Sequence, residues 1–275
     1  MAGTGTRAGR ALTVTRVPDH RPVAPTPEAR ALSKVPEVTL LFWLIKIAAT
    51  TLGETGGDAL SMSLGFGYLA ATGVFAALFA VGVGAQIAAR RFHPALYWTA
   101  LVASTTVGTT LADFATRSLG IGYPGGSLLL AALLMASLAT WRLVLGTVAI
   151  GSVATPRAEA FYWLTIMFSQ TLGTALGDWT ADTAGMGYLG AMGLFGGLLA
   201  LVAVAYRFTR LSHTLLFWLA FVLTRPLGAV VGDFLDKPLA GGGLALDRFA
   251  ASGVLLGFIV LSLVLVRSRP APAPH

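Results

Sequence analysis

Four aspartates stand at one fixed distance from four tryptophans. Each aspartate comes fifteen residues after a tryptophan that opens an apolar segment, in the pairs Trp43 and Asp58, Trp98 and Asp113, Trp163 and Asp178, and Trp218 and Asp233. Glu54 lies four residues before the first of these aspartates. Carboxylate oxygens are hard ligands that suit Mg²⁺, Mn²⁺, Ca²⁺ or protons. The spacing predicts one shared cation or proton site wherever the four segments converge.

These acids belong to a polar stripe along each segment. In a helix of about 100° per residue, positions 8, 11, 15 and 18 after each tryptophan fall within an arc of about 80°. Charged groups within a membrane cost about 2.5 kcal/mol or more and usually face the interior of a bundle. We therefore predict an ion- or substrate-binding set in which the five acids are candidate metal ligands and two bases are counter-charges: Lys46, Thr51, Glu54, Asp58, Asp113, Asp178, Arg225 and Asp233.

The composition indicates a membrane protein. The chain has 275 residues, of which 55% are apolar and only 11% charged, and it has no cysteine. This excludes a disordered chain, an ordinary cytosolic enzyme, disulfide scaffolds and thiolate metal sites. The apolar segments predict an all-α fold with eight transmembrane helices, at about 38–61, 67–89, 95–117, 125–146, 160–182, 187–206, 213–236 and 249–267.

The basic residues predict the orientation. On an eight-span topology, 14 of the 19 Lys and Arg residues fall on the side that carries both termini. The positive-inside rule then places both termini in the cytoplasm, with the protein in the bacterial cytoplasmic membrane. The net charge of +7 is thus explained by the basic residues on the cytoplasmic side. The expected partner is the lipid bilayer, and nucleic acid is not expected. Five charges near the opposite side are interpreted as loop charges: Asp182, Asp236, Lys237, Asp247 and Arg248.

The domain organisation follows from the spans. Residues 1–35 are predicted to be a disordered basic tail and 268–275 a second disordered tail. Between them lie two four-span units, 36–149 and 150–267. Each unit holds two hairpins, so the four hairpins share one orientation and a pseudo-symmetry axis along the membrane normal, four-fold or two-fold. The polar odd-numbered spans are expected inside and the even-numbered spans toward lipid.

Small residues recur beside the polar stripe. The hairpin cores read TTLGETGGD (50–58), TTVGTTLAD (105–113), QTLGTALGD (170–178) and RPLGAVVGD (225–233). Glycines spaced four apart allow helices to approach closely. We assign close helix packing to Gly53, Gly57, Gly108, Gly173, Gly177, Gly228 and Gly232. The four tryptophans are interpreted as membrane-interface anchors or packing residues.

The repeated pattern resembles a family of bacterial membrane proteins built from four tandem two-span repeats of unknown function, usually named only "membrane-anchored protein". The resemblance covers about 38–266 and rests on TTLGETGGD, the Trp-to-Asp frame in all four copies, and TRPLGAVVGD (224–233). It implies an eight-span fold and brings no settled activity with it.

The residues favour a transporter. The leading hypothesis is a proton-coupled exporter of divalent cations, with manganese as one candidate, and no cofactor apart from the transported ion. The alternatives are a carrier of another small solute, either an organic cation or an anion held by Lys46 and Arg225, a channel, and a non-catalytic structural membrane protein. An enzyme is not expected, because no HExxH, GxSxG or cysteine nucleophile occurs. The sequence carries no sign of the oligomeric state.

Overall fold

The chain folds into long helices joined by short turns. The computed structural model describes residues 33–89, 91–266 and 268–272. Over these residues the chain forms eight α-helices and no β-strand: α2 (Leu40–Asp58), α3 (Gly67–Ala88), α4 (Pro94–Asp113), α5 (Tyr123–Leu145), α6 (Pro156–Asp178), α7 (Gly187–Phe208), α8 (His213–Asp236) and α9 (Arg248–Leu265). The all-helical prediction is confirmed, with boundaries within a few residues of the expected segments.

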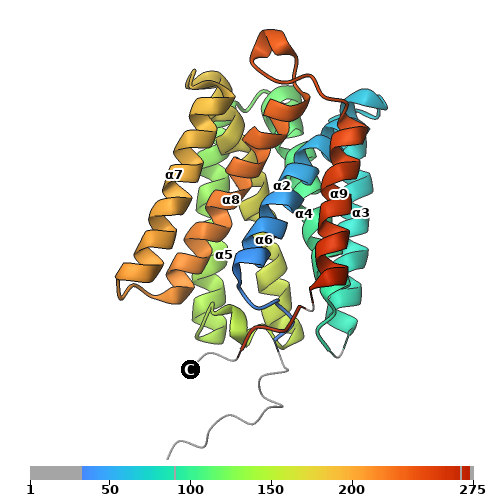
Figure 1. Ribbon diagram of the computed structural model, residues 1–275. Helices are drawn as coiled ribbons and strands as arrows, with labels where there is room; N and C mark the ends of the chain where they lie inside the picture. The colour runs from blue at the N-terminus through green and yellow to red at the C-terminus, as the bar shows by residue number, and fades with distance from the viewer. Residues whose placement is uncertain (1–32, 90, 267, 273–275) are drawn as a thin grey trace, which may run out of the picture.

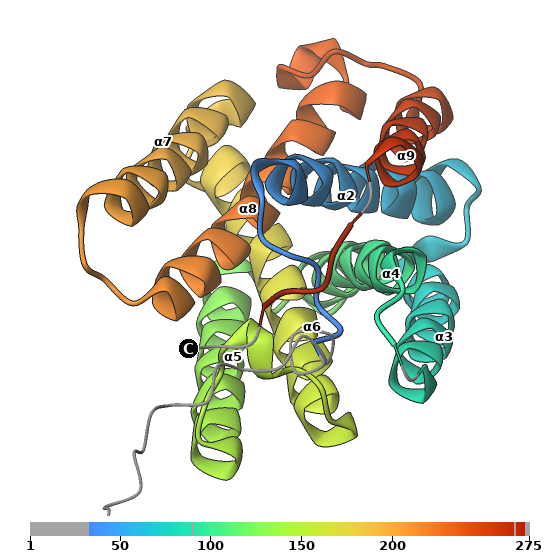
Figure 2. The same ribbon diagram turned by 60° about the horizontal axis from the view of Figure 1, so that its bottom comes forward.

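Four helices form a closed inner ring. α2 packs against α4, α4 against α6, α6 against α8, and α8 against α2 (Figures 1 and 2). The polar stripes of these helices point into the ring, and their threonines and acids are buried. The inner helices therefore bury polar side chains where a soluble bundle buries leucines.

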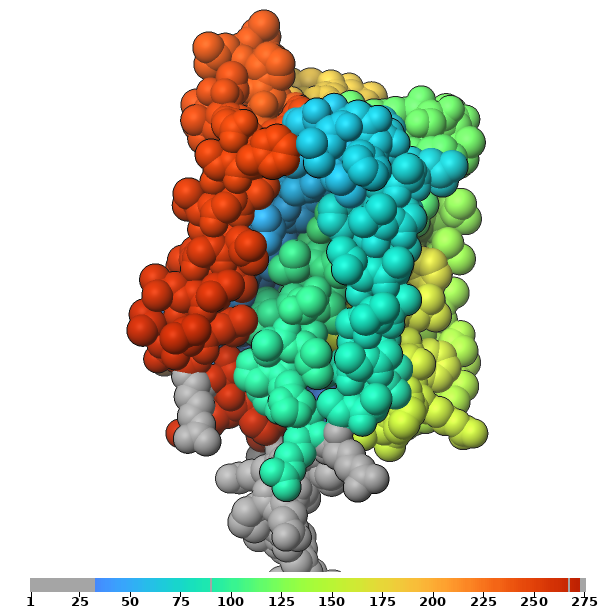
Figure 3. Space-filling view, turned by 90° about the vertical axis from the view of Figure 1, so that its right-hand side faces the viewer, coloured from blue at the N-terminus to red at the C-terminus, as the bar shows by residue number. Residues whose placement is uncertain are grey.

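The other four helices cover the ring from outside. α3 packs on α4, α5 on α6, α7 on α8, and α9 on α2. Each of α3, α5 and α7 thus packs on the inner helix that comes next in the chain. The last outer helix, α9, packs on the first inner helix, α2. Figure 3 shows one side of this outer layer, with α3 and α9 in front of α2 and α4.

The outer surface is strongly apolar. α3, α5, α7 and α9, together with α8, are long and apolar enough to cross a membrane. In each outer helix, at most 17% of the apolar 18-residue stretch that could span a membrane is buried within the protein. The inner helices α2, α4 and α6 carry the polar stripe instead, and they are shielded by their neighbours.

Glycines set the spacing between inner helices. On each inner helix, the glycine ten residues after the tryptophan packs against the next inner helix. It meets there the residue that lies seven positions after that helix's own tryptophan. The four contacts run around the whole ring: Gly53 with Thr105, Gly108 with Gln170, Gly173 with Arg225, and Gly228 with Thr50. A side chain at any of these glycines would collide with the neighbouring helix. The predicted packing glycines therefore do lie at helix contacts.

The inner helices change geometry directly after the repeated aspartates. A π-helical turn follows Asp58, Asp113 and Asp178, at Ala59–Ser63, Phe114–Ser118 and Trp179–Thr183. Two left-handed glycines then reverse the chain in each case, for example Gly65 (φ 70°) and Gly67 (φ 74°). Side chains other than glycine rarely adopt such φ values. The fourth inner helix stays α-helical to Asp236, and its loop differs.

Aromatic residues fill the half of the ring that lies away from the repeated aspartates. Tyr97 and Tyr162 join their hydroxyls at 2.6 Å, with tryptophan rings packed against both. Trp98, Trp163 and Trp218 are only 2–5% exposed. Of the two interpretations, membrane-interface anchors or packing residues, the burial favours packing for these three, because other rings cover them. Among the four repeated tryptophans, Trp43 alone is partly exposed.

Both ends of the described chain lie across one end of the bundle, which we call the terminal end (Figure 2). The Glu37 amide donates to the Arg269 carbonyl, and the Ala271 amide to the Val35 carbonyl. Buried Lys34 donates to Glu159 at 2.6 Å. The predicted tails 1–35 and 268–275 are therefore too long, because residues 33–35 and 268–272 pack on the bundle. Residues 1–32 and 273–275 lie outside the described part of the chain.

We predict that Gly228→Ala destabilises the protein. The new Cβ would lie 2.6 Å from the Thr50 Cβ and 3.0 Å from its carbonyl carbon, so α2 and α8 must move apart. Overpacking of this kind costs about 1–3 kcal/mol. Thermal unfolding in detergent measures the loss. Gly253→Ala on α9, which would meet nothing within 4 Å, is the control and should not lower the melting temperature.

Candidate functional site

The repeated acids meet at the end of the ring opposite the terminal end, which we call the acidic end. Glu54 shares one group of neighbouring carboxylates with Asp178 and Asp233, and another with Asp58 and Asp113. Asp58, Asp233 and Asp236 form a third group. Within each group the facing oxygens all lie within 4.8 Å of one another, and all six side chains are buried. The structure thus brings together every acid that the spacing singled out.

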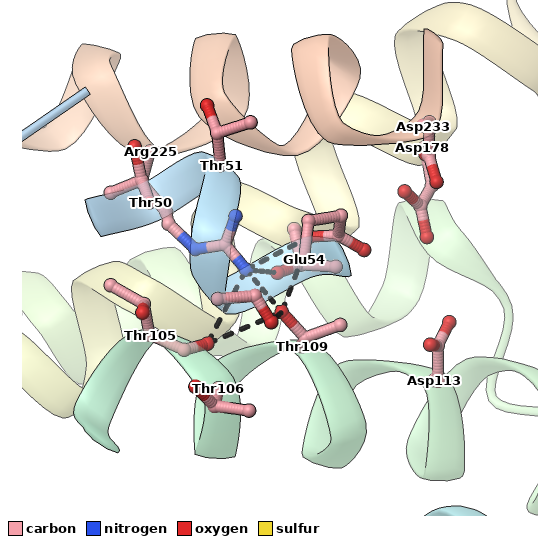
Figure 4. A network of polar contacts seen from close by, with 12 residues as sticks. Thr50, Thr51, Glu54, Thr105, Thr106, Thr109, Asp113, Asp178, Arg225 and Asp233 are labelled. Atoms are coloured by element: carbon pink, nitrogen blue, oxygen red, sulfur yellow. Dashed lines mark hydrogen bonds and ion pairs between the residues drawn. The ribbon is translucent and has the colours of Figure 1, made fainter. Parts of the chain in front are cut away.

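Arg225 lies at the centre of the ring and contacts all three other inner helices (Figure 4). Its Nη2 donates to Glu54 Oε2 on α2 at 3.1 Å, to Thr109 Oγ1 on α4 at 2.6 Å, and to Thr174 Oγ1 on α6. The Thr105 carbonyl lies 3.4 Å from the same nitrogen. The side chain is fully buried. One guanidinium therefore links four helices that come from all parts of the chain.

Three further bases pair with the aspartates at the acidic end. Lys237 lies against Asp58 and 3.1 Å from Asp233. The other two pairs are Arg248 with Asp236 at 2.7 Å and Arg117 with Asp113 at 2.9 Å. Burial lowers the pKa of the Lys237 ammonium, but Asp233, Asp58 and Asp236 raise it further, so that the pKa lies above its ordinary value. The neighbouring carboxylates therefore favour the charged form of Lys237.

The site has more negative than positive charge. Six carboxylates, namely Glu54, Asp58, Asp113, Asp178, Asp233 and Asp236, face four bases, namely Arg117, Arg225, Lys237 and Arg248. With every group ionised, this leaves an excess of two negative charges. Buried charge is costly unless it is compensated. Two protons or one divalent cation would neutralise the site.

Asp178 is the least engaged of these acids. It accepts no hydrogen bond from the described residues, and its ion-pair partner Arg117 lies 3.8 Å away. Figure 4 shows its side chain beside Asp233 and apart from Asp113, which lies on the neighbouring inner helix. Oxygens up to 4.8 Å apart can share an ion that they ligate at about 2.3–2.6 Å. The group of Asp178, Glu54 and Asp233 therefore suits a hard divalent ion.

Two members of the predicted set lie apart from the acids. The Lys46 ammonium donates to the Phe221 carbonyl and to Thr224 Oγ1, and it lies 3.7 Å from the centre of the Phe221 ring. The Thr51 hydroxyl donates to the Ile47 carbonyl of its own helix. Neither side chain contacts a carboxylate in the described structure. The interpretation of Lys46 and Thr51 as part of one site with the acids is therefore corrected.

The comparisons with known proteins agree with the repeat pattern. Four copies of a repeat described as a Repeat of Unknown Function (DUF347) match residues 41–92, 96–147, 161–212 and 216–269. The chain belongs to this family. Each DUF347 repeat spans one inner and one outer helix of the structure. Comparison with curated proteins and with solved structures gives no match.

The predicted binding set leaves out several side chains of the site. Thr109 and Thr174 are not in that set, although they lie on the predicted polar stripe, eleven residues after the tryptophan, where the first DUF347 repeat has Glu54. Lys237, Arg248 and Asp236 were interpreted as loop charges. Asp236 ends α8 and Lys237 follows it directly, four residues after Asp233. Arg248 lies at the site because the loop after α8 turns back, with the Leu244 amide bonded to the Phe234 carbonyl. No local motif indicates that turn.

We predict strong coupling between Glu54 and Arg225. Glu54→Gln or Arg225→Met alone should each cost about 3–5 kcal/mol, because each leaves a buried charge unpaired. The double variant should lose clearly less than the sum. Unfolding free energies from titration with the Tris salt of dodecyl sulfate, in buffer without alkali ions, measure this coupling.

The pair Asp113 and Arg117 is the matched control. The Arg117 side chain is 37% exposed, so solvent screens its charge. Its double-variant cycle should give a coupling of only about 0–1 kcal/mol. Equal coupling energies for the two pairs would contradict a special role for the buried pair.

Proposed function

We propose that this protein is an eight-span transporter of the bacterial cytoplasmic membrane that exchanges a divalent cation for protons. The observation that carries the proposal is the meeting of Glu54 with all four repeated aspartates inside the inner ring. Intramembrane acids that face a bundle interior typically mark ion pathways or proton relays. Manganese is the first candidate ion, because carboxylate ligands suit Mn²⁺.

The surface supports the membrane part of the proposal. The outer helices expose their apolar side chains over nearly their whole length. Together with α8 they shield the polar stripes of α2, α4 and α6, so that all eight helices can cross the bilayer. The circular glycine contacts favour a pseudo-four-fold axis along the membrane normal, with parallel repeats. The basic residues then place the terminal end in the cytoplasm.

The charge balance supports coupling to protons. The site carries two excess negative charges when all groups are ionised. One divalent cation or two protons neutralise the same excess, and a carrier must stay near neutrality while its site is buried. The proposal therefore includes an exchange of one divalent ion for two protons, which moves no net charge.

A second candidate, transport of an anionic solute, rests on Lys46. Its buried ammonium has no carboxylate within 4.0 Å in the described structure, and it lies against Thr224 beside Arg225. An anion would supply the missing negative charge. Lys46→Met separates the two candidates, because it should abolish anion transport and leave a cation site at the acidic end in place.

We predict cation flux that depends on Asp178. The purified protein in liposomes should move one of Mn²⁺, Mg²⁺, Ca²⁺ or Zn²⁺ with opposing proton movement, followed by an internal ion indicator and a pH dye. Asp178→Asn should reduce the flux at least about tenfold, which corresponds to about 1.4 kcal/mol of lost interaction. It should still fold, because Asp178 accepts no hydrogen bond from the described residues.

Asp182→Asn is the control, since Asp182 is exposed four residues further on. This variant should transport like the unmodified protein. If folded, inserted protein moves no divalent cation, or if both variants behave alike, the proposed function is wrong. A flux that follows the membrane potential would contradict only the electroneutral exchange.

A further inference from the structure

Arg225 uses its guanidinium in an unusual way. All of its hydrogen bonds come from one nitrogen, Nη2, which has four acceptors but only two hydrogens. Nε and Nη1 are buried and have no partner among the described residues. A structural arginine typically spreads its five donors over a flat fork of acceptors. Here the group acts as a single point of positive charge.

Oxygen atoms surround that point. Glu54 Oε2, Thr109 Oγ1, Thr174 Oγ1 and the Thr105 carbonyl all face Nη2, and we call these four atoms the oxygen cage. They come from three different helices. One carboxylate, two hydroxyls and one carbonyl carry a net charge of −1, which a monovalent cation would balance. Hard oxygen ligands suit such an ion.

The position of the oxygen cage follows from the repeats. Glu54, Thr109 and Thr174 are the residues eleven positions after the first three tryptophans. The fourth residue in this layer is Ala229, which has no polar side-chain atom. Arg225, one turn earlier on the same helix, passes over Gly173 and places its charge at the centre. The other residues at the position of Arg225 are Thr50, Thr105 and Gln170, none of which is charged.

We propose that the oxygen cage is a binding site for a small monovalent cation, with the Arg225 guanidinium as its tethered occupant. The cage shares Glu54 with the carboxylate groups at the acidic end and takes its other ligands from Thr105, Thr109 and Thr174. It deepens the proposed function, on which it rests, by naming a second ion position deeper in the ring. A cation enters when Arg225 withdraws, so the guanidinium and the ion alternate at one place.

The helix that carries Arg225 is suited to such a movement. Pro226 follows directly, and a proline inside a helix removes one backbone hydrogen bond. Lys46 and Thr50 of α2 bond to the carbonyls of Phe221 and Thr224, in the turn before the proline. The helix is therefore held from α2 at the point where its own hydrogen-bond ladder is interrupted.

The test removes the tethered charge and supplies a free one. In detergent, with N-methyl-D-glucamine as the only buffer cation, Arg225→Met should unfold at a lower temperature than the unmodified protein. Added Na⁺ or K⁺ should raise its melting temperature with saturation. A site with a dissociation constant of about 10 mM would shift the unfolding equilibrium about tenfold at about 100 mM salt. The unmodified protein should show no such shift, because its cage is occupied.

Three variants make the test specific. Arg225→Lys keeps a tethered cation and should not respond to Na⁺ or K⁺. Glu54→Gln/Arg225→Met removes the negative charge of the cage and should also lose the response. Arg117→Met, which removes a base at the acidic end, controls for general effects of charge and salt.

The outcomes separate this inference from the proposed function. If Arg225→Met responds to neither ion, or responds as the double variant does, the cage is not a cation site, whatever the flux measurements give. If it responds while the protein moves no divalent cation, the cage stands and the transport proposal fails. Arg225→Gln is tested alongside, and failure of both variants to fold even at high Na⁺ or K⁺ counts against the cage.

Discussion

The burial of one arginine at the centre of the inner ring constrains the whole molecule. A guanidinium cannot lose its charge under ordinary conditions, and moving it out of water is costly unless acceptors surround it. Arg225 meets this requirement with oxygens from α2, α4 and α6. Those helices must therefore stay within hydrogen-bond reach of α8. The ring can open only when another charge takes over the acceptors or when Glu54 gains a proton.

Close approach of the helices makes this arrangement possible. The contacts of Gly53, Gly108, Gly173 and Gly228 repeat around the ring, and each lets one long or branched side chain lie against bare backbone. In the proposed membrane setting hydrophobic attraction between helices is weak, so packing of small residues and hydrogen bonds would hold the bundle together. The outer helices add to this by bridging successive repeats, because each covers the inner helix of the next repeat and α9 returns to α2. No repeat can leave the ring without uncovering its neighbour.

Much of this architecture was predictable, because it depends on periodic features. Helix number, approximate boundaries, the inner position of the polar helices and the packing glycines all follow from hydropathy and from the Trp-to-Asp frame. The partners of each acid were not predictable, because they depend on which helices become neighbours. Lys237 reaches Asp58 from the end of α8, and Arg248 approaches Asp58 only through the fold of one irregular loop. The two interpretations of Trp98, Trp163 and Trp218 stayed open for a similar reason, because the sequence around a tryptophan near a helix start is the same whether lipid or protein covers its ring.

The ring also explains how a symmetric repeat can hold an asymmetric site. Glu54 occurs only in the first repeat and Arg225 only in the fourth, 171 residues apart. In a linear array of repeats these two positions would lie at opposite ends. Ring closure makes α2 and α8 neighbours, so departures from the repeat pattern in the first and last copies meet at one place. The second and third repeats contribute matching threonines, Thr109 and Thr174, at the same level. Duplication thus supplies the scaffold and the ring of aspartates, and a few substitutions in two copies supply the charge pair at its centre.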